Sequence, residues 1–134
     1  MTEQLTEEQI QTWAREAFQQ ANQFLAKEGV LFDTVVTEEC RYLAPLVAVW
    51  KIKAMDNKLY WVITGDLPTD FTLADNAEDA RGALRYFSMR WQIKAENLLQ
   101  NNDKADASQT SYAQLLADRA EKIYLLQENE GLWG

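Results

Sequence analysis

The first part of the chain repeats apolar side chains every three or four residues, as one face of an α-helix does. Thr6 and Gln9 have the spacing of a capping box, in which each side chain binds a free backbone amide at the helix start. Gly29 suits the left-handed residue that follows a helix. The pattern therefore predicts a helix from about Glu7 to Lys27. Its apolar face comprises Ile10, Trp13, Ala14, Ala17, Phe18, Ala21, Phe24 and Leu25.

The period changes to two between residues 46 and 53, where β-branched and aromatic residues alternate. Residues 59–64 have the same character, and Asp56-Asn57 between them suits a two-residue turn because both side chains tolerate positive φ. The pattern predicts an antiparallel β-hairpin. A third strand at about residues 35–37 is left open.

A two-residue loop would also fix the register of this hairpin. The pairs expected on its core face are Trp50 with Ile63, Ile52 with Trp61, and Ala54 with Leu59. The pairs expected on the wetter face are Lys51 with Val62 and Lys53 with Tyr60. We expect the core face to pack on helices.

A second long helix is predicted from about residue 76 to residue 99, opened by a capping arrangement of Asp75 and Glu78. Its main apolar face comprises Ala77, Ala80, Leu84, Phe87, Trp91, Ala95 and Leu98. A second apolar stripe, roughly opposite, comprises Gly82, Tyr86, Met89 and Ile93. A helix with two apolar sides is covered either by other parts of its own chain or by another subunit, and cover within the chain is the first expectation.

Residues 101–108 form a polar connector, and a third helix is expected to begin near Thr110 or Ser111. Gly131 would end it, with Leu132 folding back toward Leu126. The order of elements predicts one α+β domain over residues 1–134: an N-terminal helix, an antiparallel hairpin with two or three strands, and two C-terminal helices packed on the sheet.

The net charge of −8 comes from 21 acidic and 13 basic residues. Proteins that bind nucleic acid usually carry a basic surface, so we expect no nucleic-acid partner, and an acidic mimic of nucleic acid is only a distant alternative. The longest apolar run, residues 43–50, contains Pro45 and is too short to span a bilayer, so we expect no membrane partner. The single cysteine, Cys40, and an N-terminus without a signal-like apolar segment indicate the cytoplasm.

The sequence contains no histidine, which excludes a Ser-His-Asp triad, a Cys-His pair and imidazole metal ligands. None of the five glycines has the spacing of a phosphate-binding loop. We therefore expect no cofactor and favour a function without catalysis.

One turn remains a candidate ligand site. Asp66, Thr69 and Asp70 follow a hydrophobic strand, and such oxygen ligands suit Mg²⁺ or Ca²⁺. The same residue types also stabilise turns through their own backbone, and we expect that structural role. Arg41, Arg81 and Arg85 are candidates to clamp an anion, although pairing with Asp66, Asp70 or Glu78 is the simpler expectation.

Four stretches resemble a family of short proteobacterial proteins of unknown function. They are residues 41–51 (RYLAPLVAVWK), 60–70 (YWVITGDLPTD), 85–88 (RYFS) and 91–96 (WQIKAE). This resemblance covers most of the chain but implies no activity, cofactor or site residue.

Two functions of different classes follow. The first is a non-catalytic protein that binds another protein or its own copy through Tyr86, Met89 and Ile93, or through the third helix, as an adaptor, an inhibitor or a chaperone. The alternative is a binder of a small ligand or divalent metal, or a hydrolase, built on the Asp66–Asp70 turn with nearby arginines.

Overall fold

The first helix, α1, runs over Glu7–Lys27, the bounds expected from the sequence. The protein is described here from a computed structural model that covers residues 5–100 and 107–133. The capping box is present: the Thr6 amide donates to Gln9 Oε1 at 2.8 Å, and the Gln9 amide donates to Thr6 Oγ1 at 3.1 Å. At the other end Gly29 takes φ +80°, and the Val30 amide donates to the Leu25 carbonyl at 2.8 Å. These are the features of a Schellman cap.

Five antiparallel strands follow α1, in place of the two or three expected. They are β1 (Phe32–Val35), β2 (Arg41–Leu43), β3 (Val47–Ala54), β4 (Leu59–Gly65) and β5 (Asp70–Leu73). The sheet order is β1-β3-β4-β5, and β2 also pairs with β3. A short 3₁₀ turn, Thr37–Glu39, separates β1 from β2. The two short strands thus share one edge of β3.

The pairing of Ala54 with Lys58 closes the hairpin between β3 and β4, so its loop holds three residues, 55–57, and not the expected two. The Ala54 amide donates to the Lys58 carbonyl at 3.0 Å, and the Asn57 amide donates to the Ala54 carbonyl at 3.0 Å. Asn57 takes φ +67°, so the loop is a turn closed by one left-handed residue, which is the common three-residue hairpin. Asp56 Oδ1 accepts the Lys58 amide at 2.9 Å and holds the turn.

This extra loop residue shifts the expected register by one, so the predicted pairs were wrong. Trp50 lies opposite Val62, and Ile52 lies opposite Tyr60. Because successive side chains of a strand point to opposite faces, Trp61 and Ile63 lie on the other face from Trp50. All six of these residues are buried, so both faces of the hairpin are largely covered. The second face is wet only toward the turn, where Lys51 and Lys53 are half-buried and Leu59 is 38% exposed.

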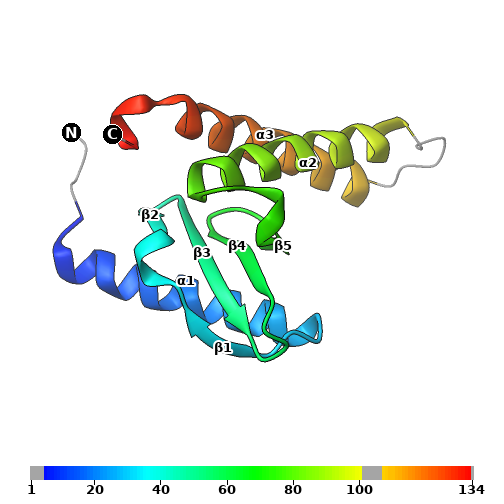
Figure 1. Cartoon of the computed structure of the whole chain (residues 1–134). Coiled ribbons are helices and arrows are strands. Elements are labelled where there is room, and N and C mark those ends of the chain that lie inside the picture. Colours follow the sequence, from blue (N-terminus) through cyan, green and yellow to red (C-terminus); the bar gives the residue numbers. More distant parts are fainter. Residues whose placement is uncertain (1–4, 101–106, 134) are drawn as a thin grey trace. The chain divides into compact units, whose positions relative to one another are not determined.

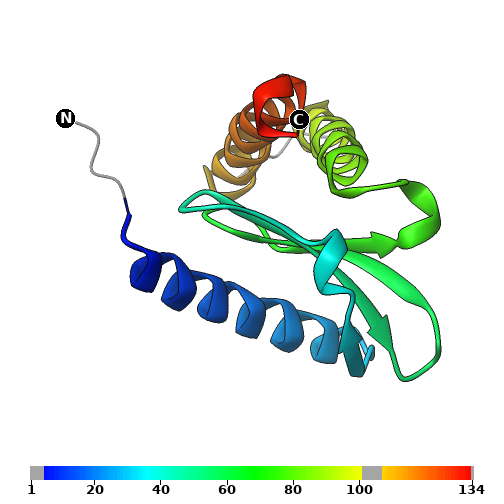
Figure 2. The same cartoon turned by 60° about the vertical axis from the view of Figure 1, so that its left-hand side comes forward.

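One core lies between α1 and one face of the sheet (Figure 2). The Trp50 indole N–H donates to Thr64 Oγ1 at 2.9 Å inside it. The buried members of this core are Ala17, Ala21, Leu25, Cys40, Ala48, Trp50, Ile52, Ala54, Tyr60 and Val62. Trp13, Phe18, Val30, Val35 and Phe71 pack around them.

The chain leaves β4 through a further strand, whereas the sequence predicted a direct turn into the second helix. β5 and the 3₁₀ turn Ala74–Asn76 come first, and helix α2 runs over Ala80–Gln100. The expected start of this helix near residue 76 was therefore about four residues too early. The Trp61 indole N–H donates to the Ala77 carbonyl at 3.0 Å and ties this connection to β4.

The chain forms two compact units, Met1–Ala80 and Arg81–Gly134. In the second unit α2 and α3 (Ala107–Glu128) run antiparallel (Figure 1). Ser88 Oγ donates to the Ala120 carbonyl at 2.8 Å, and the Lys94 ammonium lies 5.6 Å from the centre of the Tyr112 ring. The expectation of one domain over all 134 residues stays a prediction.

The third helix is longer than expected and ends differently. It extends back to Ala107, and the rest of the predicted connector lies outside the described residues. Its last residue is Glu128, and a 3₁₀ turn (Glu130–Leu132) follows in place of the expected glycine cap. The Trp133 indole N–H donates to the Leu126 carbonyl at 3.0 Å, so the aromatic ring closes the helix end.

The expected α+β class and the order of helix, antiparallel strands and two helices are confirmed. Among the helices of the described residues, none has the length and apolar character needed to cross a membrane.

Candidate functional site

The Asp66–Asp70 turn begins at a glycine that the backbone requires. Gly65 takes φ +131°, and a Cβ built on it would lie 2.3 Å from the Leu46 carbonyl oxygen. The Asp66 amide donates to that same carbonyl at 2.9 Å. The exposed Asp66 carboxylate is thus placed by the close approach of the two strand ends.

Asp70 opens strand β5, where it pairs with Ile63. Its Oδ1 accepts the amide of Phe71 at 2.8 Å, which is the turn-stabilising role expected of this carboxylate. Thr69 precedes it and is half-buried. Within residues 5–100 and 107–133, the structure contains no cluster of three or more carboxylate, thiol or imidazole groups placed to hold a metal ion.

Arg41, the candidate anion ligand of the first unit, is exposed on β2. Its Nη1 donates to the carbonyl of Cys40 at 3.0 Å. The neighbouring Cys40 thiol is buried in the α1 core and donates to the Val36 carbonyl at 3.4 Å. Burial raises the pKa of this thiol, which keeps it in the unreactive protonated form.

Arg81 and Arg85, the candidate anion ligands of the second unit, meet at one glutamine. Arg81 Nε donates to the Gln127 carbonyl at 2.6 Å, and Arg85 Nε donates to Gln127 Oε1 at 3.1 Å. Gln127 is buried on α3, and sequence reasoning missed it. The only signal available was its position one helical turn after the apolar Ile123. The expected pairing of these arginines with Asp66, Asp70 or Glu78 stays a prediction.

The second apolar stripe of α2 is the largest departure from the expectation of cover within the chain. Met89 is 60% exposed and Ile93 is 54% exposed. Tyr86 is half-buried, with its ring edge-to-face against Phe87 at 5.7 Å between centroids. The expectation that this stripe is covered by other parts of the chain was therefore wrong for Met89 and Ile93.

Met89 borders a hollow of about 370 Å³ between α2 and α3. Tyr124 of α3 lines the same hollow together with Arg85 and Gln92. A hydrogen bond from Tyr124 to Glu128 raises the pKa of the Tyr124 phenol, so the hollow keeps a neutral hydroxyl at physiological pH. Sequence reasoning did not single out this residue.

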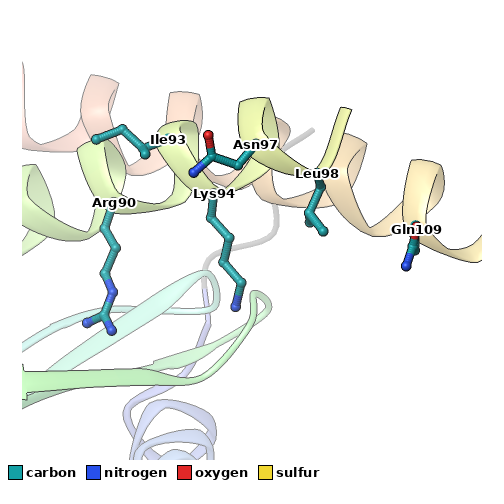
Figure 3. A pocket seen from close by; sticks show the side chains of 6 residues that line it. All are labelled: Arg90, Ile93, Lys94, Asn97, Leu98 and Gln109. Carbon is teal, nitrogen blue, oxygen red and sulfur yellow. The ribbon is translucent and has the colours of Figure 1, made fainter. Parts of the chain in front are cut away.

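Ile93 borders a second hollow of about 410 Å³ (Figure 3). Figure 3 shows Arg90 and Lys94 extending to one side of α2, with Ile93 on the other. Asn97, Leu98 and, from α3, Gln109 complete the lining. The two exposed apolar side chains of α2 thus stand next to hollows in which a partner side chain can be seated.

The third helix, the other candidate contact, also exposes apolar side chains, of which Leu125 is the most exposed at 57%. The others are Tyr112, Leu115 and Tyr124. These positions are scattered around α3, while Met89 and Ile93 are one turn apart on one face of α2. The more ordered surface is therefore that of α2.

Comparison with known proteins gives a family but no function. A family described as a domain of unknown function (DUF4826) matches residues 7–133, nearly the whole chain. The chain belongs to the DUF4826 family. No curated protein and no solved structure matches it. Membership of DUF4826 agrees with the resemblance seen in the sequence to a family of unknown function, and it assigns no site residue.

Proposed function

We propose that this DUF4826 protein is a non-catalytic protein-binding domain whose contact surface is the exposed face of α2. The observation that carries the proposal is the exposure of Met89 and Ile93, at 60% and 54%, next to two hollows. Large apolar side chains that stand beside hollows suit the seating of a partner's side chains. Single exposed apolar residues are common on proteins, whereas Met89 and Ile93 form a pair on one face of a helix with a hollow beside each.

The side chains available for catalysis also support a non-catalytic role. Histidine is missing from the sequence, and burial keeps the pKa of the Cys40 thiol raised. The two candidate arginines of α2 hold the end of α3 through Gln127. Side chains that hold the fold in this way favour a binding role, which an adaptor, an inhibitor or a chaperone would share.

Source and location are part of this proposal. The resemblance of residues 41–51 and 60–70 to short proteobacterial proteins supports a bacterial source. A single cysteine supports a location in the cytoplasm, where thiols stay reduced.

The net charge is divided unevenly between the two units. The first unit carries 14 acidic and 6 basic residues and the second carries seven of each, so the whole net charge of −8 resides in the first unit.

The test is photo-crosslinking in cells, with a photoreactive amino acid at position 89 or 93. Matched control positions are 31 and 55, because Leu31 and Met55 are 64% and 65% exposed and lie in the first unit. We expect a defined adduct at 89 and 93, identified by mass spectrometry as this chain or as another protein. We expect the purified partner to bind the Met89→Glu variant at least about tenfold more weakly than it binds the wild type. The same adducts at all four positions, or none at 89 and 93, would show that the α2 face is not the contact.

A further inference from the structure

The exposed face of α2 carries opposite charges at its two ends. Arg85 and Glu96 are both exposed, and Met89 and Ile93 lie between them. Arg85 and Glu96 are eleven positions apart, which is close to three turns of an α-helix, so they return to the same side. They are separated by roughly 16 Å along the helix axis at about 1.5 Å per residue.

Such a face is complementary to itself only in one orientation. In a two-fold pair of antiparallel α2 helices, the axis lies midway between positions 85 and 96, and each Arg85 faces the partner's Glu96. The Met89 and Ile93 side chains of both copies then meet at the centre. In a parallel pair Arg85 would face Arg85, and the like charges would repel. The charges therefore select the antiparallel arrangement.

The other features of the face fit a second copy. Two-fold contacts use the same patch on both subunits, and the hollow beside Met89, about 370 Å³ in volume, is open to the partner's Met89. The Arg85 guanidinium is held by its bond to Gln127 Oε1 at 3.1 Å, and Glu96 Oε1 accepts a bond from Gln100 at 3.3 Å. Each charge is thus oriented by a neighbour on its own unit.

From this self-complementarity we infer that the partner at the α2 face is a second copy of this chain, paired antiparallel about a two-fold axis. The inference rests on the proposed function and names its partner. One pair of helices buries less surface than the roughly 1,200 Å² or more of a standard interface. The dimer is therefore weak and exchanges its subunits readily.

Charge reversal gives the test, with the full chain and sedimentation velocity as the readout. We expect the wild type to approach twice its 15.5 kDa mass as its concentration rises. Arg85→Glu places two acids together at both ends of the pair, and Glu96→Arg places two bases together. Each variant should raise the dimer dissociation constant about tenfold to a hundredfold, since two ion pairs become two repulsions.

Mixing the two variants is the decisive step. A heterodimer of Arg85→Glu with Glu96→Arg has opposite charges at both contacts, so the mixture should regain wild-type dimerisation. Arg15→Glu and Glu16→Arg are matched reversals of exposed residues on α1, and they should change nothing. Glu96→Arg leaves Gln127 and the helix core untouched, so its own weakening of the dimer tests the contact even if Arg85→Glu loses stability.

Two results would overturn the inference. A wild type that remains monomeric up to millimolar concentration would exclude the second copy as the partner. The crosslinking test at positions 89 and 93 would then still decide whether another protein binds there. A mixture that stays monomeric while the wild type dimerises would show that Arg85 and Glu96 do not face each other.

Discussion

The carbonyl oxygen of Leu46 approaches Gly65 so closely that a Cβ on Gly65 would lie 2.3 Å from it. Gly65 also takes φ +131°, a conformation that other residues adopt only under strain. We predict that Gly65→Ala lowers the free energy of unfolding by at least about 2 kcal/mol, measured by urea denaturation.

Two other glycines provide a graded control for this prediction. Gly29 has φ +80°, and an added Cβ would meet nothing within 4 Å. Gly29→Ala should therefore lower the free energy of unfolding by about 1 kcal/mol. A Cβ on Gly131 would lie 3.3 Å from Asn129 Oδ1, and Gly131→Ala should lower the free energy of unfolding by less still. A loss at Gly65 no larger than that at Gly131 would contradict the close approach of Leu46.

The buried bond from the Trp50 indole to Thr64 Oγ1, 2.9 Å long, gives a second prediction. Thr64→Val keeps the side-chain shape but leaves the indole N–H without this acceptor, and we expect a loss of about 1–3 kcal/mol in the free energy of unfolding. Thr34→Val, at an exposed position of β1, is the matched control and should be near neutral. Equal effects of the two substitutions would argue against the bond.

Asp56 and Tyr60 predict a dependence of stability on pH. The Lys58 amide lowers the pKa of Asp56 from its ordinary 3.8, so the stabilisation from Asp56 is present above that value and lost as pH falls through the lowered pKa. Burial, with the bond to Asp56, raises the pKa of Tyr60 from its ordinary 10.0. The stabilisation from Tyr60 is therefore present below that value and lost as pH rises toward the raised pKa.

We expect the advantage of the wild type over Tyr60→Phe to be largest between these limits and to shrink on both sides. Urea unfolding of both proteins from about pH 3 to about pH 11 measures it. The difference between the two proteins isolates Tyr60, because the pKa values of Tyr42 and Tyr124 are also raised. A constant difference across the range would show that the bond from Tyr60 to Asp56 does not form.

The Asp66–Asp70 turn can be tested as a structural element. Asp70→Ala removes the acceptor of the Phe71 amide and should lower the free energy of unfolding by about 1 kcal/mol. Asp70→Asn keeps an acceptor oxygen and should lose less. We expect Mg²⁺ and Ca²⁺ to leave the melting temperature unchanged. A wild type stabilised by either ion, with that gain lost in both variants, would show that the turn is an ion site.

The first helix could be predicted to the residue because every signal for it is local. Apolar periodicity, the Thr6–Gln9 capping box and Gly29 all lie within the helix or no more than two residues beyond it. The α+β order was equally accessible, since each helix and the central hairpin carry their own period.

The hairpin register could not be predicted from the same kind of pattern. Both Asp56 and Asn57 tolerate positive φ, but only Asn57 adopts it, and one extra loop residue reversed the face assigned to Trp61. In β4 the apolar residues follow each other without alternation because both faces of the strand are buried, so the sequence does not distinguish the two registers. Strand β5 was missed because its four residues give too short a pattern.

The candidate surface was partly visible in the sequence. Met89 and Ile93 follow from helical spacing alone, and their exposure is a property of the folded chain. Gln127 and Tyr124 were not visible as site residues, because their roles depend on the antiparallel placement of α3 beside α2. The partner of Trp133 was hidden for a similar reason: the ring folds back onto the Leu126 carbonyl.

We expect a partner to bind the exposed face of α2. The most direct measurement is the affinity of two double variants for the partner crosslinked at position 93, whether a second copy or another protein. Met89→Glu/Ile93→Glu changes the α2 face, and Leu31→Glu/Met55→Glu removes apolar surface of similar exposure from the first unit. We expect at least about tenfold weaker binding for the first variant, wild-type affinity for the second and unchanged melting temperatures for both. Equal affinity of both variants, or weakening of the second alone, would contradict it.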